Sequence, residues 1–150
     1  MIVQLVSHKK NNIAKIYERG YAQMFQIDPL SRVPVYEKLV MQIESYVLTD
    51  ILQPGSQLPS VRNMSVSLSV NPNTIQKAIV ELDRRGLVYS VPGKGCFIAD
   101  NAKDVLKLTK QNRLNELEEI AKELKLAGIH KNMLIERIEK VYEDTKGVIQ

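Results

Sequence analysis

Two signals for the start of a helix lie close together in the middle of the chain, at Ser60 and at Asn71. A Ser or Asn side chain at the N-cap accepts a hydrogen bond from a backbone N–H that the first helical turn leaves unpaired. Pro72 suits the first helical position, because its φ angle is already helical. Apolar residues recur at helical spacing after each signal. The sequence therefore predicts two helices joined by a tight turn, a short one over residues 61–68 and a longer one over 72–84.

A further helix is expected before this pair. From Pro34, apolar residues recur every three or four positions to about Ile51, and the Pro-Gly pair at 54–55 ends the pattern. Upstream of it, apolar and polar residues alternate over residues 25–28 until Pro29. This alternation predicts a short edge strand.

A β-hairpin is expected after the pair, because Gly86 marks the end of its second helix. Residues 87–91 and 96–98 favour strands, and the Gly-rich stretch over 92–95 favours a turn between them. Two helices joined by a short turn and followed by a hairpin form the plan of a winged helix-turn-helix. The expected fold is mainly α with a small β-hairpin wing.

In this plan the second helix of the pair enters the major groove of DNA, and its first residues reach base edges. Its start is polar and has no acidic residue, and the N–H groups and dipole there favour phosphate. Asn and Gln side chains bond adenine edges, whereas Lys and Arg reach guanine or phosphate. Glycines in the wing allow a close approach of its backbone to DNA. The residues expected at DNA on these grounds are Arg62, Asn71, Asn73, Thr74, Gln76, Lys77, Gly93, Lys94 and Gly95.

From about residue 102 the chain is rich in helix formers and charged residues, and Gly128 divides it into two expected helices. Apolar residues in both recur at steps of three and four, which is typical of a helix-pairing seam. Since the winged region has its own core, we expect these seams to join two protomers. The predicted dimerisation residues are Leu114, Leu117, Ala121, Leu124, Leu134, Ile138 and Val141.

Residues 34–98 resemble the DNA-binding domain of the GntR family of bacterial regulators, through blocks at 34–39, 52–62, 70–78, 81–82, 86–88, 93–95 and 97–98. The Asn-Pro-Asn-Thr run at 71–74 and the short C-terminal part resemble its YtrA-type branch. The resemblance implies that Ser60 lies at DNA, together with Arg62, the start of the second helix and the wing. Many members of the family have Arg at the positions of Pro72 and Gln76, so a different base preference is expected here.

These arguments predict three regions: an irregular N-terminal extension (residues 1–24), a winged helix-turn-helix DNA-binding domain (25–100) and a helical dimerisation region (101–150). The resemblance implies a transcription regulator, most often a repressor. A homodimer is expected to read a pseudo-palindromic operator, because the half-sites follow its two-fold axis. No cofactor is expected. A small-molecule effector bound between protomers and a winged-helix module that binds only proteins stay open as alternatives.

Composition restricts the other classes of function. The net charge of +4 permits a polyanionic partner. No apolar run approaches the roughly 20 residues of a membrane span, and the apolar start precedes its charges, unlike a signal peptide. We therefore expect a cytoplasmic protein. Cys96 is the single cysteine, expected as a buried strand residue, and neither it nor His8 or His130 suggests a metal site or an enzyme.

Overall fold

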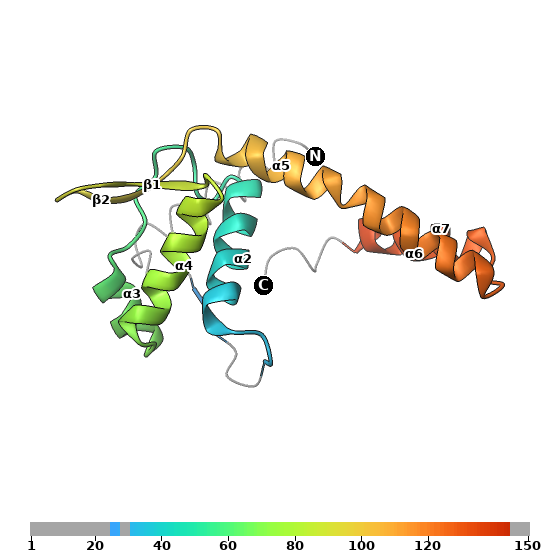
Figure 1. Ribbon diagram of the computed structural model, residues 1–150, viewed down its shortest axis with the longest axis horizontal. Helices are drawn as coiled ribbons and strands as arrows, with labels where there is room; N and C mark the ends of the chain where they lie inside the picture. Colours follow the sequence, from blue (N-terminus) through green and yellow to red (C-terminus); the bar gives the residue numbers. More distant parts are fainter. Residues whose placement is uncertain (1–24, 28–30, 145–150) are drawn as a thin grey trace. The chain divides into compact units, whose positions relative to one another are not determined.

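Residues 25–27 and 31–144 are described by a computed structural model, and the predicted extension over 1–24 lies outside them. The chain divides into two compact units, residues 1–107 and 108–150. The expectation of a mainly α fold with a small hairpin is confirmed (Figure 1). The elements are α2 (Val35–Leu48), α3 (Val61–Leu68), α4 (Pro72–Arg84), β1 (Val88–Val91), β2 (Gly95–Ile98), α5 (Ala102–Asn112), α6 (Leu114–Leu126) and α7 (Lys131–Glu143).

Helices α3 and α4 begin at the two predicted caps. The Ser60 hydroxyl accepts a hydrogen bond from the Asn63 N–H at 3.1 Å, and Asn71 Oδ1 accepts one from the Asn73 N–H at 2.8 Å. Between the helices, Ser69 takes a left-handed conformation with φ of 54°. The sharp reversal at this residue lets α3 end and α4 begin within three residues, which makes the predicted tight turn.

Helix α2 ends at Leu48 rather than near Ile51. Asp50 has a positive φ of 62°, which takes the backbone out of the helical region. The N–H groups of Ile51 and Leu52 then both donate to the Tyr46 carbonyl, at 2.8 and 3.0 Å. These bonds satisfy a carbonyl that the end of the helix would otherwise leave unpaired.

The expected edge strand does not form over its described part, residues 25–27. A side chain takes the place of a neighbouring strand, because the amide of Gln42 pairs with the backbone of Gln26. The Gln26 N–H donates to Gln42 Oε1 at 3.1 Å, and Gln42 Nε2 donates to the Gln26 carbonyl. Phe25 is buried against Tyr46, with ring centroids 5.8 Å apart. The segment is thus held on α2 by side chains.

The wing is the predicted two-stranded antiparallel hairpin. Val88 pairs with Ile98 at its base, and Val91 pairs with Gly95 next to its turn. Within the turn, the Lys94 N–H donates to the Val91 carbonyl at 3.0 Å. The sequence Pro-Gly at 92–93, with a φ of 73° at the glycine, suits the central positions of a type II turn.

The outer edge of β2 pairs with the segment that leads into α3. The Ile98 N–H donates to the Ser56 carbonyl at 2.9 Å, and the Leu58 N–H donates to the Cys96 carbonyl at 2.8 Å. Gln57 lies opposite Phe97 in an antiparallel bridge between these two bonds. The wing is therefore attached to the helix-turn-helix by backbone pairing as well as by its own chain connection.

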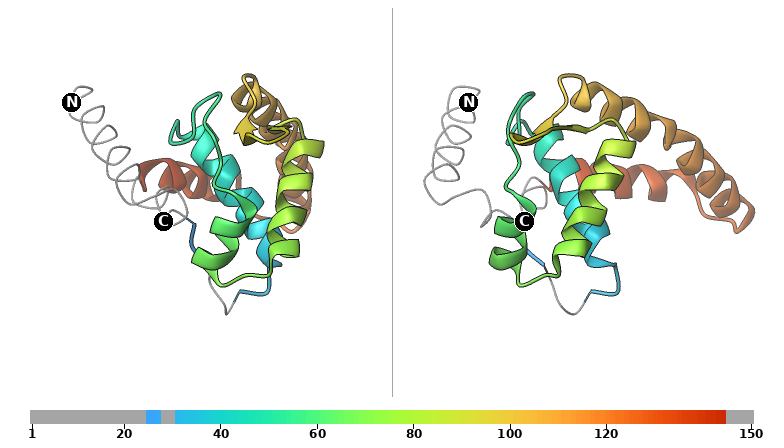
Figure 2. Two further views of the ribbon diagram at one scale, coloured as in Figure 1. Left: turned by 90° about the vertical axis from the view of Figure 1, so that its left-hand side faces the viewer. Right: turned by 60° about the vertical axis from the view of Figure 1, so that its left-hand side comes forward.

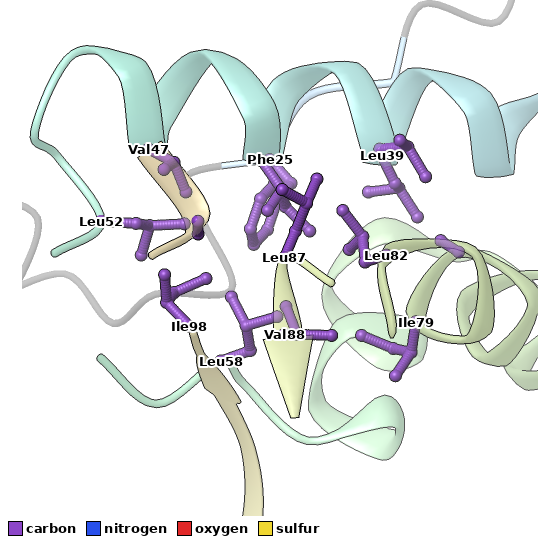
Figure 3. Packing of buried hydrophobic residues seen from close by; sticks show 14 of the residues in the cluster. Phe25, Leu39, Val47, Leu52, Leu58, Ile79, Leu82, Leu87, Val88 and Ile98 are labelled. Carbon is purple, nitrogen blue, oxygen red and sulfur yellow. The ribbon is translucent and has the colours of Figure 1, made fainter. Parts of the chain in front are cut away.

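One hydrophobic core holds the first unit together. Helix α4 packs on α2, α3 and β1, and α2 and α4 run side by side in both views of Figure 2. Figure 3 shows apolar side chains of α2, α4 and the hairpin pointing toward one another. Ile75, Ala78, Ile79 and Leu82 of α4 are all buried, as their spacing predicted. This leaves the other face of α4 turned toward solvent.

The core also includes the beginning of α5, since Ala102 and Leu106 are buried in it. The division between units falls after Lys107, later than the expected boundary at residue 100. Between residues 101 and 144 the chain forms three helices instead of the two expected, because α5 ends at Asn112 and α6 starts at Leu114.

In the second unit, none of the described residues is buried. Apolar side chains of α6 and α7 are largely exposed, including Leu117 at 46% and Ile138 at 44%. Ala121, Leu124 and Leu134 are half-buried. An apolar seam on an amphipathic helix normally packs against another element, and the described part of this unit leaves Leu114, Leu117, Ile138 and Val141 of the seam exposed.

Candidate nucleic-acid interface

A cleft of about 460 Å³ lies between the start of α3, one face of α4 and the wing. Its walls come from three parts of the first unit that are far apart in sequence. They are residues 57–61 before and at the start of α3, Gln76 and Ile79 on α4, and residues 90–96 of the hairpin. Its lining combines apolar residues such as Leu58 and Ile79 with polar residues such as Gln57, Ser60 and Gln76.

The cleft brings together half of the ten predicted contact residues. Those in its lining are Ser60, Gln76, Gly93, Lys94 and Gly95. The other five lie outside the lining, and they are Arg62, Asn71, Asn73, Thr74 and Lys77. All ten are exposed except Thr74, which is half-buried. The cleft therefore unites only some of the predicted residues. Among all ten, Thr74 offers the least exposed surface to a ligand.

The start of α4 carries polar side chains and is the positive end of the helix dipole. Its first turn contains no acidic residue, so nothing there repels an anion. Asn71 Oδ1 is already occupied by the Asn73 N–H, which assigns this side-chain oxygen to capping. The exposed side chains of Asn73 and Gln76 are left to meet a partner.

Lys77 has a neighbour that the sequence analysis missed. Its Nζ lies 3.8 Å from the centre of the Tyr36 ring, which belongs to the first turn of α2. A cation over an aromatic face is attracted by the ring quadrupole. The Tyr36 hydroxyl in turn donates to Glu37 Oε1 at 2.8 Å, and this bond raises the pKa of the tyrosine. Tyr36 thus limits the positions open to the Lys77 ammonium.

Gln57 is the second functional candidate that the sequence analysis missed. Its Nε2 donates to the carbonyl of Lys94 at 2.7 Å, across 37 residues of chain. No local sequence signal distinguishes this glutamine from an ordinary exposed one, since the contact exists only once the wing has folded back on the α3 segment.

Cys96 is half-buried in β2 and lines the cleft. Burial raises the pKa of its thiol above the usual range, although a hydrogen bond with Ser90 acts in the opposite direction. A raised pKa disfavours the reactive thiolate. Among the described residues, no three His, Cys, Asp or Glu side chains are grouped so as to hold a metal ion.

At the far end of α4, acidic side chains are paired with arginines. Glu81 contacts Arg84 and Arg85, each at 2.8 Å, and these hydrogen bonds lower the pKa of Glu81 to about 2. Arg85 also reaches the buried Glu44 on α2 at 2.7 Å. These acidic groups are therefore neutralised by arginines at the end of α4 opposite its polar start.

Residues 34–98 match the bacterial regulatory proteins of the gntR family. The HTH-type transcriptional repressor YtrA of Bacillus subtilis is 38% identical over 125 residues, which cover 83% of this chain and 96% of YtrA. The chain belongs to the GntR family. A second relative, the HTH-type transcriptional regulator YhcF of the same bacterium, is 37% identical over 75% of this chain and 93% of its own length. The GntR resemblance expected from the sequence is thus confirmed, including its YtrA-type character.

Solved structures agree with the GntR assignment. A transcriptional regulator from Oenococcus oeni is 36% identical with a TM-score of 0.60, covering 82% of this chain and all of that protein. A GntR family regulator from Listeria monocytogenes is 29% identical with a TM-score of 0.61, covering 76% and 98%. This GntR protein is accordingly a DNA-binding transcription regulator. No helix in the described part of the chain has the length and apolar character needed to cross a membrane.

Proposed function

We propose that this GntR-family regulator is a repressor that binds a pseudo-palindromic operator as a homodimer. The observation that carries the proposal is the exposed, acid-free start of α4, in the same unit as a wing whose turn exposes Lys94. The N–H groups of such a helix end attract phosphate, and its amide side chains suit base edges. The relative named YtrA is a repressor, which supports the direction of regulation.

Each contact group has a distinct role in this proposal. Asn73 and Gln76 read base edges in the major groove, because their exposed amides offer a donor and an acceptor together. Arg62, Lys77 and Lys94 contact phosphates, which fix the register of the protein on the duplex without selecting sequence. The remaining predicted residues approach DNA through backbone or through short side chains, and they are Ser60, Asn71, Thr74, Gly93 and Gly95.

The homodimer is supported by the exposed apolar seams of α6 and α7. Burial of each square ångström of apolar surface is favourable by about 25 cal/mol, so pairing of these seams provides the driving force for association. We assign residues 25–100 to DNA binding and 101–150 to dimerisation, with the start of α5 packed in the core of the first unit. Because the ligand is chromosomal DNA, we place the protein in the cytoplasm.

We further propose that the protein is no enzyme and needs no cofactor for DNA binding. Its family and relatives are regulators, and the cleft is bordered by groups that suit nucleic acid. An effector that binds between protomers would act by changing the geometry of the dimer.

The decisive test is the selection of bound sequences from a random duplex library. The expected product is an inverted repeat whose half-sites are spaced by about one helical turn or a multiple of it. Recovery of no enriched sequence, with no retention on mixed duplex DNA at low salt, would instead identify a module that binds only proteins. An enriched but asymmetric single site would reject the homodimer.

A further inference from the structure

The outer edge of β2 offers carbonyl groups at every second residue, at Ile98, Cys96 and Lys94. The first two are satisfied by backbone N–H groups, with the Gly55 N–H on Ile98 at 2.9 Å and the Leu58 N–H on Cys96 at 2.8 Å. In an antiparallel ladder the next donor in register would come from the residue two positions beyond Leu58. The edge of the wing therefore has a third acceptor, at its tip, in line with two that are paired.

The backbone cannot continue this ladder to the tip. Ser60, the residue in register with Lys94, is the N-cap of α3, and the chain turns into the helix there. The Gln57 side chain fills the place of the missing backbone donor, since its Nε2 lies 2.7 Å from the Lys94 carbonyl. A side-chain amide thus extends the pairing of the strand edge to the wing tip.

Gly95 makes room for this amide. A Cβ at position 95 would lie 2.7 Å from Gln57 Nε2, closer than non-bonded carbon and nitrogen atoms approach. The φ of Gly95 is also positive, at 125°, a region that only glycine enters readily. The glycine and the glutamine therefore form a matched pair, in which one provides space and the other provides the hydrogen bond.

We propose that Gln57 is a positioning residue for DNA binding, which orders the wing tip so that the Lys94 ammonium is presented to phosphate. The backbone pairs between the α3 segment and β2 reach only to Cys96, so the Gln57 contact extends the attachment of the wing to its tip. Anchoring the Lys94 carbonyl fixes the backbone from which this side chain projects. The inference rests on the proposed contact between Lys94 and DNA, and its first test does not depend on that contact.

The first test measures order at the wing tip in the free, full-length protein by ¹⁵N relaxation. Gln57→Met keeps the length of the side chain and removes the donor, while Gln57→Asn keeps the amide and shortens the reach. In both variants the order parameters of residues 93–95 should fall from about 0.85 toward 0.6 or below. Gln53→Met is the matched control, because Gln53 is exposed in the same segment and lies outside the cleft lining. Unchanged order in the Gln57 variants would overturn the proposal.

The second test measures the affinity of a random-sequence duplex over a range of salt concentrations. Gln57→Met should weaken binding by roughly three- to tenfold and lower the salt slope by up to about 0.9, the value for one phosphate contact. In a Lys94→Ala background the same change should have almost no further effect, because the two residues act through one contact. Equal weakening in both backgrounds would show that Gln57 acts apart from Lys94 and would reject the positioning role.

The two tests separate this inference from the proposed function. If Lys94→Ala leaves affinity and salt slope unchanged, the wing contact in the proposed function is wrong, and so is the DNA-binding role of Gln57. If Lys94→Ala weakens binding but Gln57→Met changes neither the order parameters of the wing tip nor the affinity, only the role of Gln57 is rejected. The thermal unfolding midpoint of each variant shows that it is folded.

Discussion

Polar residues at the start of α4 divide between building the helix and meeting its partner. Asn71 uses its side-chain oxygen to cap the helix at 2.8 Å from the Asn73 N–H, whereas the side chains of Asn73 and Gln76 are exposed. Lys77 rests on Tyr36, and Lys94 projects from a backbone that Gln57 holds. We therefore expect these side chains to differ in their effects on stability, affinity and sequence preference.

Lys94 and Asn73 should differ in the kind of binding they support. Lys94→Ala should weaken binding to all duplexes alike and lower the salt slope by about 1, as expected for a lost phosphate contact. Asn73→Ala should change base preference at one position of each half-site, with a cost of about 1–3 kcal/mol for the preferred base. Competition assays with matched and substituted duplexes measure both effects. A uniform loss in Asn73→Ala would reassign that side chain to phosphate.

Asn71 allows capping to be separated from contact with DNA. Asn71→Ala should lower the free energy of unfolding by about 1 kcal/mol, because the helix loses its cap. Asn71→Asp should keep the stability, since Asp caps equally well, but weaken DNA binding roughly fivefold, as repulsion of about 1 kcal/mol from a nearby phosphate would give. Urea unfolding and a binding titration measure the two quantities. Full affinity in Asn71→Asp would place the start of α4 away from the phosphates.

Among the elements of the first unit, α4 is the one that joins α2, α3 and the wing. It packs on α2, α3 and β1 through its buried face, and Arg85 at its end reaches Glu44 on α2. The same helix therefore carries the core on one face and the proposed DNA contacts on the other. Its orientation depends on how firmly it is joined to α2.

Arg85 should contribute more to this attachment than its neighbour Arg84. Arg85 contacts Glu44, whose side chain is only 7% exposed, while Arg84 is 72% exposed and, among the described residues, pairs only with Glu81 on its own helix. Arg85→Met should lower the free energy of unfolding by about 1.5–3 kcal/mol, the range for a hydrogen bond to a charged group. Arg84→Met, as the matched control, should cost about 1 kcal/mol or less. Equal losses in urea unfolding would show that the contact with α2 contributes nothing extra.

At the scale of the whole molecule, each protomer contributes one copy of α4 and one wing to the proposed DNA contact. An operator with two-fold symmetry needs two copies, and the exposed seams of α6 and α7 are the surfaces that we propose join them. In this proposal, burial of these apolar side chains couples the assembly of the protein to the symmetry of its DNA site.

Leu117 provides the test of this coupling. Leu117→Lys should shift the protein from dimer to monomer in sedimentation experiments, because an unpaired charge at an apolar interface is costly to bury. Operator affinity should fall with it, as each monomer then binds only a half-site. Met41→Lys is the control, since Met41 on α2 has similar exposure, 51% against 46%, and lies outside the seam. A Leu117→Lys protein that stays dimeric would move the interface elsewhere.

The order of the elements follows from local chemistry that the sequence contains by itself. A cap at Ser60, the Asn71-Pro72 start and the Gly-rich turn of the wing each act within a few residues. These signals sufficed to predict α3, α4 and the hairpin, and the blocks around them sufficed to predict the family. The predicted contact and dimerisation residues stay predictions until the experiments above are made.

Only the tertiary structure decided which distant side chains complete these elements. Phe25 packs on α2 instead of forming a strand, Tyr36 meets Lys77, and Gln57 reaches the Lys94 carbonyl across 37 residues. Helix capping and hydrophobic periodicity depend on neighbours along the chain, so they can be recognised from the sequence alone. A contact between remote residues depends on how whole elements pack, and no spacing in the sequence encodes it.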